Sequence, residues 1–374
     1  SINNNTVSIA KATASTVALT AIWVQSAPAT MNINGNTITS YNSASNTSSS
    51  TTDNCVIRSG LAGIGTLNIN NNNISGVTFG GTTGTNEVIA VSGAPVTAMN
   101  INGNTISGIT ITGVTTKTVR GIYVSSAVST CANAINNNTF SNITWSGGTP
   151  TGEFSFIYGA VSPLSWNING NTLTGSITTP TTGSFYCIYN SQSTSLGLVS
   201  NNNLTGTGIT RTGASGLTYG YYNGSSPTGT FTFSGNTFSN FSQSASSGVL
   251  YGIYLLTSTS CKQVLQNNTF TNLTAGTGTL YAINHNYGNT GSEISGNTIT
   301  GLTGASIVAG INIGTTGSNS MIAFNNVISN LTTTGASTVS GILHSAGSNS
   351  SIYSNKIYNL NANNAGATAI GINI

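Results

Sequence analysis

The sequence predicts an all-β solenoid of about twelve stacked rungs, each with three strands, and three observations indicate this fold. A short motif, Asn-Ile-Asn-Gly-Asn-Thr-Ile at residues 32–38, recurs along the 374 residues of the chain. Apolar residues hold constant positions before and after each copy. A third apolar segment, such as Gly121-Ile122-Tyr123-Val124, lies 13 to 16 residues upstream of each copy. A repeat of about 32 residues is in the range of solenoid units, which stack on one another.

One Asn in each copy defines the phase of the repeat. Successive copies of this Asn are 29 to 36 residues apart. If the copies stack one rung per turn, about 4.8 Å apart, their side chains form a column that can hydrogen-bond amide to amide. We therefore expect an internal ladder made of Asn5, Asn36, Asn72, Asn104, Asn138, Asn171, Asn202, Asn236, Asn268, Asn297, Asn326 and Asn355.

A tight corner is expected immediately before each ladder Asn. The preceding residue is Gly in five copies, Asn in six and Ser354 in the last. Gly and Asn are the residues that best tolerate a positive φ angle. The pattern therefore predicts one left-handed residue per rung, as at Gly35 in Asn34-Gly35-Asn36-Thr37.

Apolar residues on each side of the corner predict strands. The residue two after each ladder Asn is apolar, as at Ile38, and the residue three before is usually apolar, as at Ile33. In the third segment the central residue is Ile in every copy but one, which has Tyr221. Because strand side chains alternate between two faces, we expect this central residue to point inward and the next one outward. We expect one continuous solenoid domain over residues 1–374.

The composition limits the possible partners. Only 3% of the residues are charged, against roughly a quarter in ordinary soluble domains. Seven Lys and Arg against four Asp and Glu give a net charge of +3, too few cations for a surface that follows a phosphate backbone. We therefore expect no nucleic-acid partner. No apolar run reaches the length of about 18 residues that a membrane-spanning helix needs, so no membrane span is expected.

The repeat resembles a known family. The two segments of the pattern, Gly-Ile-Tyr as at residues 121–123 and Ile-Asn-Gly-Asn-Thr-Ile-Ser-Gly-Ile as at residues 101–109, are similar to the right-handed parallel β-helix repeat of the pectin-lyase-like superfamily. Within it, the chain looks most like the Asn/Thr/Ser/Gly-rich repeats of long secreted bacterial surface proteins. The resemblance implies a right-handed parallel β-helix and an extracellular or cell-surface location. It does not select a function, because this fold hosts enzymes and structural proteins alike.

Carboxylates that could act in catalysis are few. Glu87 and Arg120 hold the same phase in neighbouring rungs, which predicts an ion pair worth at most about 1 kcal/mol if it is exposed. The alternative is a catalytic group of Asp53, Glu87 and Arg58, as hydrolases and lyases use clustered carboxylates. We favour the ion pair and expect no catalytic residue.

The histidines and cysteines give no metal or redox signal. His285 and His344 differ in phase, and neither has a carboxylate in register, so surface imidazoles are favoured over a general base. The four cysteines, Cys55, Cys131, Cys187 and Cys261, lie in different rungs, too far apart for a disulfide. Their spacing does not match a metal site. We expect no disulfide, metal or cofactor.

Tyrosines recur just after the inward residue of the third segment. In five successive rungs this outward position holds Tyr123, Tyr158, Tyr189, Tyr222 and Tyr254, and Trp23 holds it in an earlier rung. A second column, two residues before the inward position, holds Tyr186, Tyr219, Tyr251 and Tyr281. Stacked rings could simply support neighbouring rungs. The functional alternatives are a lateral contact between filaments or a polysaccharide-binding strip, because exposed aromatic area favours a partner.

The two ends of the sequence show no capping segment. The chain starts within a repeat, at Ser1, Ile2 and Asn3, and stops within the third segment, at Ile372, Asn373 and Ile374. Uncapped solenoid ends are unpaired strand edges. These residues predict head-to-tail stacking into a homopolymer, with lateral bundles as a further option. A segment cut from a longer β-helix is the alternative.

The sequence is compatible with three functions. The first is a non-enzymatic extracellular structural protein, either a filament subunit or an adhesin stalk. The second is a carbohydrate-active or carbohydrate-binding β-helix. The third is an ice-binding surface, which would use the Thr ranks at Thr6, Thr37, Thr105, Thr139, Thr172, Thr237, Thr269 and Thr298.

Overall fold

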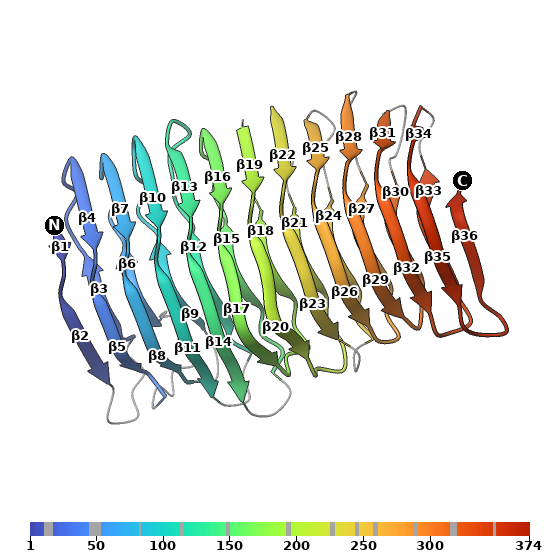
Figure 1. Ribbon diagram of the computed structural model, residues 1–374. Helices are drawn as coiled ribbons and strands as arrows, with labels where there is room; N and C mark the ends of the chain where they lie inside the picture. The colour runs from blue at the N-terminus through green and yellow to red at the C-terminus, as the bar shows by residue number, and fades with distance from the viewer. Residues whose placement is uncertain are drawn as a thin grey trace.

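The chain folds as a parallel β-solenoid in which successive rungs stack along one axis (Figure 1). The computed structural model describes residues 1–10, 18–44, 54–81, 84–112, 116–146, 150–191, 196–224, 229–243, 247–256, 261–286, 291–314, 320–346 and 349–374, without the side chains of residues 206 and 207. Residues 1 and 374 lie at opposite ends of the stack.

Three parallel sheets run the length of the solenoid, with twelve strands each in the described residues. Sheet 1 contains β1 (Ile2–Asn3), β4 (Thr30–Asn34), β7 (Thr66–Asn70), β10 (Ala98–Asn102), β13 (Ala132–Asn136), β16 (Ser165–Asn169), β19 (Leu196–Ser200), β22 (Thr230–Ser234), β25 (Lys262–Gln266), β28 (Ser292–Ser295), β31 (Met321–Phe324) and β34 (Ser351–Tyr353). Sheet 2 contains β2 (Thr6–Ala10), β5 (Thr37–Asn42), β8 (Asn73–Phe79), β11 (Thr105–Thr112), β14 (Thr139–Ser146), β17 (Thr172–Thr179), β20 (Asn203–Arg211), β23 (Thr237–Gln243), β26 (Thr269–Ala275), β29 (Thr298–Gly304), β32 (Val327–Thr333) and β35 (Lys356–Ala362).

Sheet 3 contains β3 (Thr20–Val24), β6 (Asn54–Ser59), β9 (Thr85–Val91), β12 (Thr118–Val124), β15 (Phe154–Gly159), β18 (Phe185–Asn190), β21 (Thr218–Asn223), β24 (Leu250–Leu255), β27 (Leu280–His285), β30 (Val308–Gly314), β33 (Thr338–Ala346) and β36 (Thr368–Asn373). Every rung thus contributes one strand to each sheet. The all-β solenoid with three strands per rung is confirmed.

The inward columns of the core follow the repeat in register. Ile101 pairs with Ile69 on one side and with Ile135 on the other. In the second rung, Ile33 and Ile38 flank the corner and are both fully buried. Stacking of equivalent apolar residues therefore builds one hydrophobic column for each inward position. Burying such side chains stabilises the fold by about 1.5–3 kcal/mol each.

The corner between sheets 1 and 2 is left-handed in every rung, as predicted. The residue before each ladder Asn has a positive φ angle, between 53° at Asn201 and Ser354 and 66° at Gly170. Asn and Gly alternate at this position along the stack, with Ser in place of Gly in the last rung: Asn4, Gly35, Asn71, Gly103, Asn137, Gly170, Asn201, Gly235, Asn267, Gly296, Asn325, Ser354. A Cβ atom on any of the five glycines would overlap Oδ1 of the Asn in the preceding rung. The structural period at this corner is therefore two rungs.

The strands of sheet 3 bend one residue before their central inward residue. Pairing runs through Arg120 with Ser155 and resumes at Ile122 with Ile157, so the intervening residue is skipped. This intervening residue is Gly121 in β12, where a Cβ would come within 2.6 Å of the Phe156 carbonyl oxygen. The bend changes the alternation, so the residue just before it and the residue two after it both face outward, as Tyr186 and Tyr189 do. This is why both tyrosine columns lie on one face.

Candidate functional site

The buried Asn ladder is continuous through the described rungs. Each inner Asn donates its backbone N–H and its Nδ2–H to Oδ1 of the next ladder Asn, as Asn104 does to Asn138 at 3.0 and 2.9 Å. Nδ2 also donates to a carbonyl of the preceding rung, as from Asn104 to Ile69 O at 2.8 Å. The ten inner ladder residues, Asn36 to Asn326, are at most 1% exposed. The expected internal ladder is confirmed.

The ladder has a direction. All hydrogen bonds from one ladder Asn to the next are donated toward the C-terminal end, and each Oδ1 accepts from the rung before it, as at Asn138. Every inner Asn therefore links three rungs. Because a buried polar group without a partner costs about 1–3 kcal/mol, the ladder also makes each rung depend on its neighbours.

Two adjoining tyrosine columns cover the outer face of sheet 3 from β12 to β27. In the first column, neighbouring ring centroids are 4.4 to 5.4 Å apart from Tyr123 to Tyr254. In the second column, they are 4.9 to 5.8 Å apart from Tyr186 to Tyr281. The columns also touch each other, with 4.6 Å between the Tyr186 and Tyr189 rings. The predicted first column is thus assembled by the structure, and it packs on a second one.

The tyrosines present mainly ring edges to solvent. The Tyr158 and Tyr189 rings are stacked with an angle of 4° between their planes, so each covers a face of the other. Tyr219, in the second column, is only 4% exposed. A sugar ring that binds an aromatic residue needs an open ring face, and these faces are largely used between rungs. The geometry supports packing between rungs, and contact with a filament or a sugar stays a prediction.

Burial raises the pKa values of several of these phenols. It raises the pKa of Tyr186 to about 12, with a hydrogen bond to Ser184 acting in the opposite direction. Burial also raises the pKa values of Tyr189, Tyr219 and Tyr251. These four tyrosines therefore carry hydroxyl groups at physiological pH.

A buried ion cluster adjoins the tyrosine columns at β6, β9 and β12. Glu87 Oε2 lies 3.4 Å from Arg58 Nη2, and Glu87 Oε1 lies 3.7 Å from Arg120 Nη1. The predicted pair of Glu87 and Arg120 is present, and the limit of about 1 kcal/mol for an exposed pair does not apply to it, since the Glu87 side chain is 2% exposed. Removing one partner of a buried pair costs about 3–5 kcal/mol.

The ion cluster connects directly to the aromatic face. The Arg120 guanidinium lies over the Tyr123 ring, 4.0 Å from its centroid, and 4.6 Å from that of Tyr158. In the next rung, burial raises the pKa of Glu153, and Arg120 opposes this shift. Glu87 is held between two guanidinium groups, so it is poorly placed to exchange protons with a substrate. Asp53, its companion in the catalytic alternative, lies outside the described residues.

A surface hollow lies beside Trp23 at the N-terminal end of sheet 3. Its lining includes Trp23, Gln25, Arg58, Leu61 and Ser92. Trp23 is 56% exposed, so its indole is open to solvent to a degree that the inner tyrosines are not. An exposed indole next to polar side chains is the arrangement on this face best suited to contact a small polar ligand.

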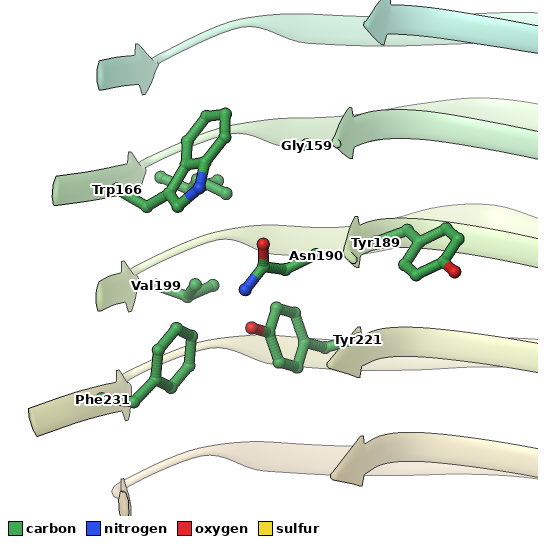
Figure 2. Close-up of a pocket in the computed structure, with 8 residues that line it drawn as sticks. Gly159, Trp166, Tyr189, Asn190, Val199, Tyr221 and Phe231 are labelled. Atoms are coloured by element: carbon green, nitrogen blue, oxygen red, sulfur yellow. The ribbon is translucent and has the colours of Figure 1, made fainter. Parts of the chain in front are cut away.

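An enclosed space lies between sheets 1 and 3 (Figure 2). The Asn190 amide and the Tyr221 hydroxyl point into it, next to Trp166 and Phe231. Its room of about 10 Å³ for the centre of a water molecule is close to the minimum for a single water. Asn190 Nδ2 donates to Asn223 Oδ1 at 3.0 Å. The space is therefore part of the interior and is too small for a sugar or a cofactor.

His285 is a buried residue, and the expectation of a surface imidazole is wrong. It lies in an inward column between Leu255 and Ile313 and is 0% exposed. Neither ring nitrogen has a hydrogen-bond partner among the described residues. Burial lowers the pKa of His285 to about 3, so the imidazole is neutral in the fold. His285 lies two residues after the inward Ile283, so the alternation of β27 turns its side chain inward.

The cysteines and the residues of the two ends lie at the positions in the rungs that the repeat predicts. Cys55, Cys131, Cys187 and Cys261 are free thiols and buried. Ser1, Ile2 and Asn3 lie at one end of the stack, and Ile372, Asn373 and Ile374 at the other. No group of three or more His, Cys, Asp or Glu that could hold a metal is found in the described part of the chain. The described residues also include no helix able to cross a membrane.

Two features of the structure were not predicted. Arg211 is buried and donates through Nη2 to the Thr181 and Gly183 carbonyls, at 2.8 and 2.6 Å; burial lowers its pKa to about 10. A second left-handed position follows four residues after many ladder Asn residues, as at Asn142 with φ 53°. The recurrent Ser/Thr-Gly/Asn-apolar triplet, as in Ser141-Asn142-Ile143, was the available signal for this second position.

Comparison with known proteins finds no relatives for this chain. No family model, curated protein or solved structure matches it significantly.

Proposed function

We propose that this chain is a non-enzymatic extracellular structural protein, serving as a filament subunit or as the stalk of a surface adhesin. The observation that carries the proposal is the ladder, which joins every described rung to its neighbours by buried hydrogen bonds. Three parallel sheets reinforce the same axis. A rod built this way resists bending and stretching, because deformation breaks hydrogen bonds in the ladder and in all three sheets together.

The proposal extends to family and location. The repeat resembles that of the pectin-lyase-like superfamily and, within it, the Asn/Thr/Ser/Gly-rich repeats of secreted bacterial surface proteins. A surface with 3% charged residues has little like-charge repulsion and favours association between copies. Antibody labelling of intact, unpermeabilised source cells tests the location, and signal that appears only after permeabilisation contradicts it.

Single-molecule pulling tests the structural role. With the chain held at its two ends, we expect force peaks separated by the extension of one rung. A rung of 29 to 36 residues releases about 100–120 Å of extended chain. Gradual lengthening without peaks would contradict the proposal.

A carbohydrate-binding role is the second candidate, and the exposed Trp23 beside the hollow at Arg58 favours it. A glycan array followed by calorimetry tests it. Trp23→Ala should abolish binding, and Tyr189→Ala, whose ring faces are stacked, should leave it unchanged. The absence of binding to any glycan on the array by the wild-type chain would remove this candidate.

A further inference from the structure

The two tyrosine columns together form one continuous network of touching rings, which we call the tyrosine network. Every ring in it has a neighbour whose centroid lies within 5.8 Å. Contacts also cross between the columns, with 4.8 Å between the Tyr219 and Tyr222 rings and 4.6 Å between the Tyr251 and Tyr254 rings. The network runs from β12 to β27, about 24 Å along the axis at the usual strand spacing.

Both limits of the tyrosine network lie inside the chain. In the adjoining rungs, the positions of the two columns hold Ala90 and Ser155 on the N-terminal side and Asn284 and Ala309 on the C-terminal side. Sheet 3 continues through these rungs with the same pairing. The fold therefore does not require tyrosine at these positions, and the network is a local addition to the solenoid.

The network consists of phenols, whereas the interior of the same rungs uses phenylalanine, as at the stacked Phe154 and Phe185. A phenol gives up one electron far more readily than a plain benzene ring, because its oxidation is coupled to the loss of the hydroxyl proton. Electron transfer between two rings slows steeply with distance, so rings in contact make the fastest steps. Tyr189 and Tyr222 are half-buried, so water is available at this face to accept and return protons.

We propose that the tyrosine network carries an oxidising equivalent along sheet 3 by electron hopping between phenols, starting from a one-electron oxidant such as a hydroxyl or peroxyl radical in solution. The oxidant is reduced by one electron, and the first tyrosine loses that electron and releases its proton to water. The next tyrosine then gives an electron to this neutral radical and a proton to water, and the first takes up a proton. Each hop therefore moves the radical one ring further without a net change in protons. This activity goes beyond the proposed structural role and does not depend on it.

A light-driven oxidant fixed at one limit of the network tests this transfer. Asn286→Cys places a thiol beside Tyr254, because the Asn286 side chain donates to the Tyr254 hydroxyl at 3.4 Å. The native cysteines are buried, so a thiol-reactive ruthenium polypyridyl complex should attach to the new thiol alone. Flash photolysis with a sacrificial electron acceptor generates the oxidant, and a nitroso spin trap marks the tyrosyl radicals. Mass spectrometry should find the trap on Tyr123, about 19 Å from Tyr254 along the axis.

Phenylalanine substitutions separate transfer from packing, because they keep the ring and remove the hydroxyl. Replacing the network tyrosines of β18 and β21 leaves a single step of about 14 Å between Tyr158 and Tyr254, and the trap on Tyr123 should fall at least about tenfold. Trapping at Tyr281, on the near side of the gap, should be unchanged. The matched control is Tyr221→Phe, an inward residue of β21 that packs on phenylalanines outside the network; it should leave the trap on Tyr123 unchanged. The four replacements are Tyr186→Phe, Tyr189→Phe, Tyr219→Phe and Tyr222→Phe.

A second attachment site covers the case in which the four-phenylalanine variant does not fold. Thr271→Cys carries the ruthenium complex on the outer face of β26, in the same rung as β27 but on sheet 2. From there the trap on Tyr123 should be lost, although the distance along the axis is similar. Equal trapping from Thr271→Cys and Asn286→Cys would overturn the inference, as would equal trapping in the four-phenylalanine variant.

Transfer through solution is detected with a mixed sample. An isotope-labelled chain without the ruthenium complex is added before photolysis, and its Tyr123 should carry no trap. Equal trapping on both chains would show that the oxidant diffuses and would overturn the inference. The same conclusion follows if Tyr123 of the Asn286→Cys chain carries no trap at all.

Discussion

The Asn ladder and the tyrosine columns are two stacked arrays that run along the same axis. The ladder occupies the interior, and its inner members are at most 1% exposed. The tyrosine columns lie on the outside of sheet 3 and extend only from β12 to β27. Ladder contacts are directional hydrogen bonds with a fixed donor and acceptor, whereas ring contacts vary from stacked to edge-on, as between Tyr158–Tyr189 and Tyr189–Tyr222.

The difference shows which array specifies the fold. A polar side chain in the core is tolerated only if each of its groups is satisfied, so the ladder must be present in every rung and in register. A ring on the outer face loses only packing when its neighbour is absent. The ladder therefore sets the register of the solenoid, and the tyrosine columns add local stability on one face.

The largest effect should come from breaking the ladder at its centre. Asn138→Ala removes the acceptor of Asn104 N and Nδ2 and the donor to the Ile101 carbonyl. Because these groups stay buried without partners, we expect a loss of about 4 kcal/mol in the free energy of unfolding. Chemical denaturation measures the loss. The outward neighbour is the control: Thr139→Ala should change stability by less than about 0.5 kcal/mol.

Acidification should destabilise the fold through His285. Unlike the ladder Asn residues, this buried side chain has no hydrogen-bond partner among the described residues. Because the folded pKa of His285 is about 3 and the unfolded value is about 6.5, the unfolded state binds the proton between these values. Stability contributed by neutral His285 is present above pH 6.5 and falls as the pH falls toward 3, by up to about 1.4 kcal/mol per unit. Between pH 7 and pH 4 this amounts to about 3 kcal/mol.

His285→Leu isolates that contribution. Leu matches the neighbouring Leu255 of the same column, so the variant should unfold at higher denaturant concentration than wild type and lose less stability in acid. Equal acid sensitivity of the two proteins would show that His285 does not titrate as its burial implies.

A smaller effect is expected in the tyrosine columns. Tyr219 stacks between Tyr186 and Tyr251, with centroid distances of 4.9 and 5.2 Å. Tyr219→Ala should destabilise the fold by about 2 kcal/mol, since it removes a largely buried ring and two stacking contacts. Thermal unfolding gives the value. Tyr254→Ala, at the end of the first column, should cost less; an equal cost would contradict the assigned burial.

The smallest effect should come from the alternation at the corner. Gly103→Ala combines a positive φ angle with an overlap at Asn71 Oδ1, and we expect a cost of about 1 kcal/mol. In the double variant with Asn71→Gly, the overlap is relieved and the φ penalty remains. A double-mutant cycle should therefore give a coupling of about 0.5 kcal/mol. A coupling of zero would show that the alternation has another origin.

The local chemistry of the repeat made most of the fold predictable. Asn36 with Gly35 before it, and Ile33 and Ile38 on either side, specify a left-handed corner, an inward amide and two core residues. The same residue types in twelve copies specify a solenoid, because only stacking buries their apolar faces. The candidate site was less predictable. Tyr158 and Tyr189 were recognised as neighbours in a column, but the direction of their ring faces depends on packing between the columns.

The sequence by itself determined the rung, its phase and the ladder, since these arise from short-range residue patterns repeated many times. The tertiary structure decided three further features: the lack of a hydrogen-bond partner for the buried His285 among the described residues, the burial of Glu87 between Arg58 and Arg120, and the overlap with Asn71 Oδ1 that a Cβ at Gly103 would create. Each depends on a contact between residues about 30 apart in the chain. Such contacts form only when rungs stack, because the neighbouring rung supplies the contact partner of each of these residues.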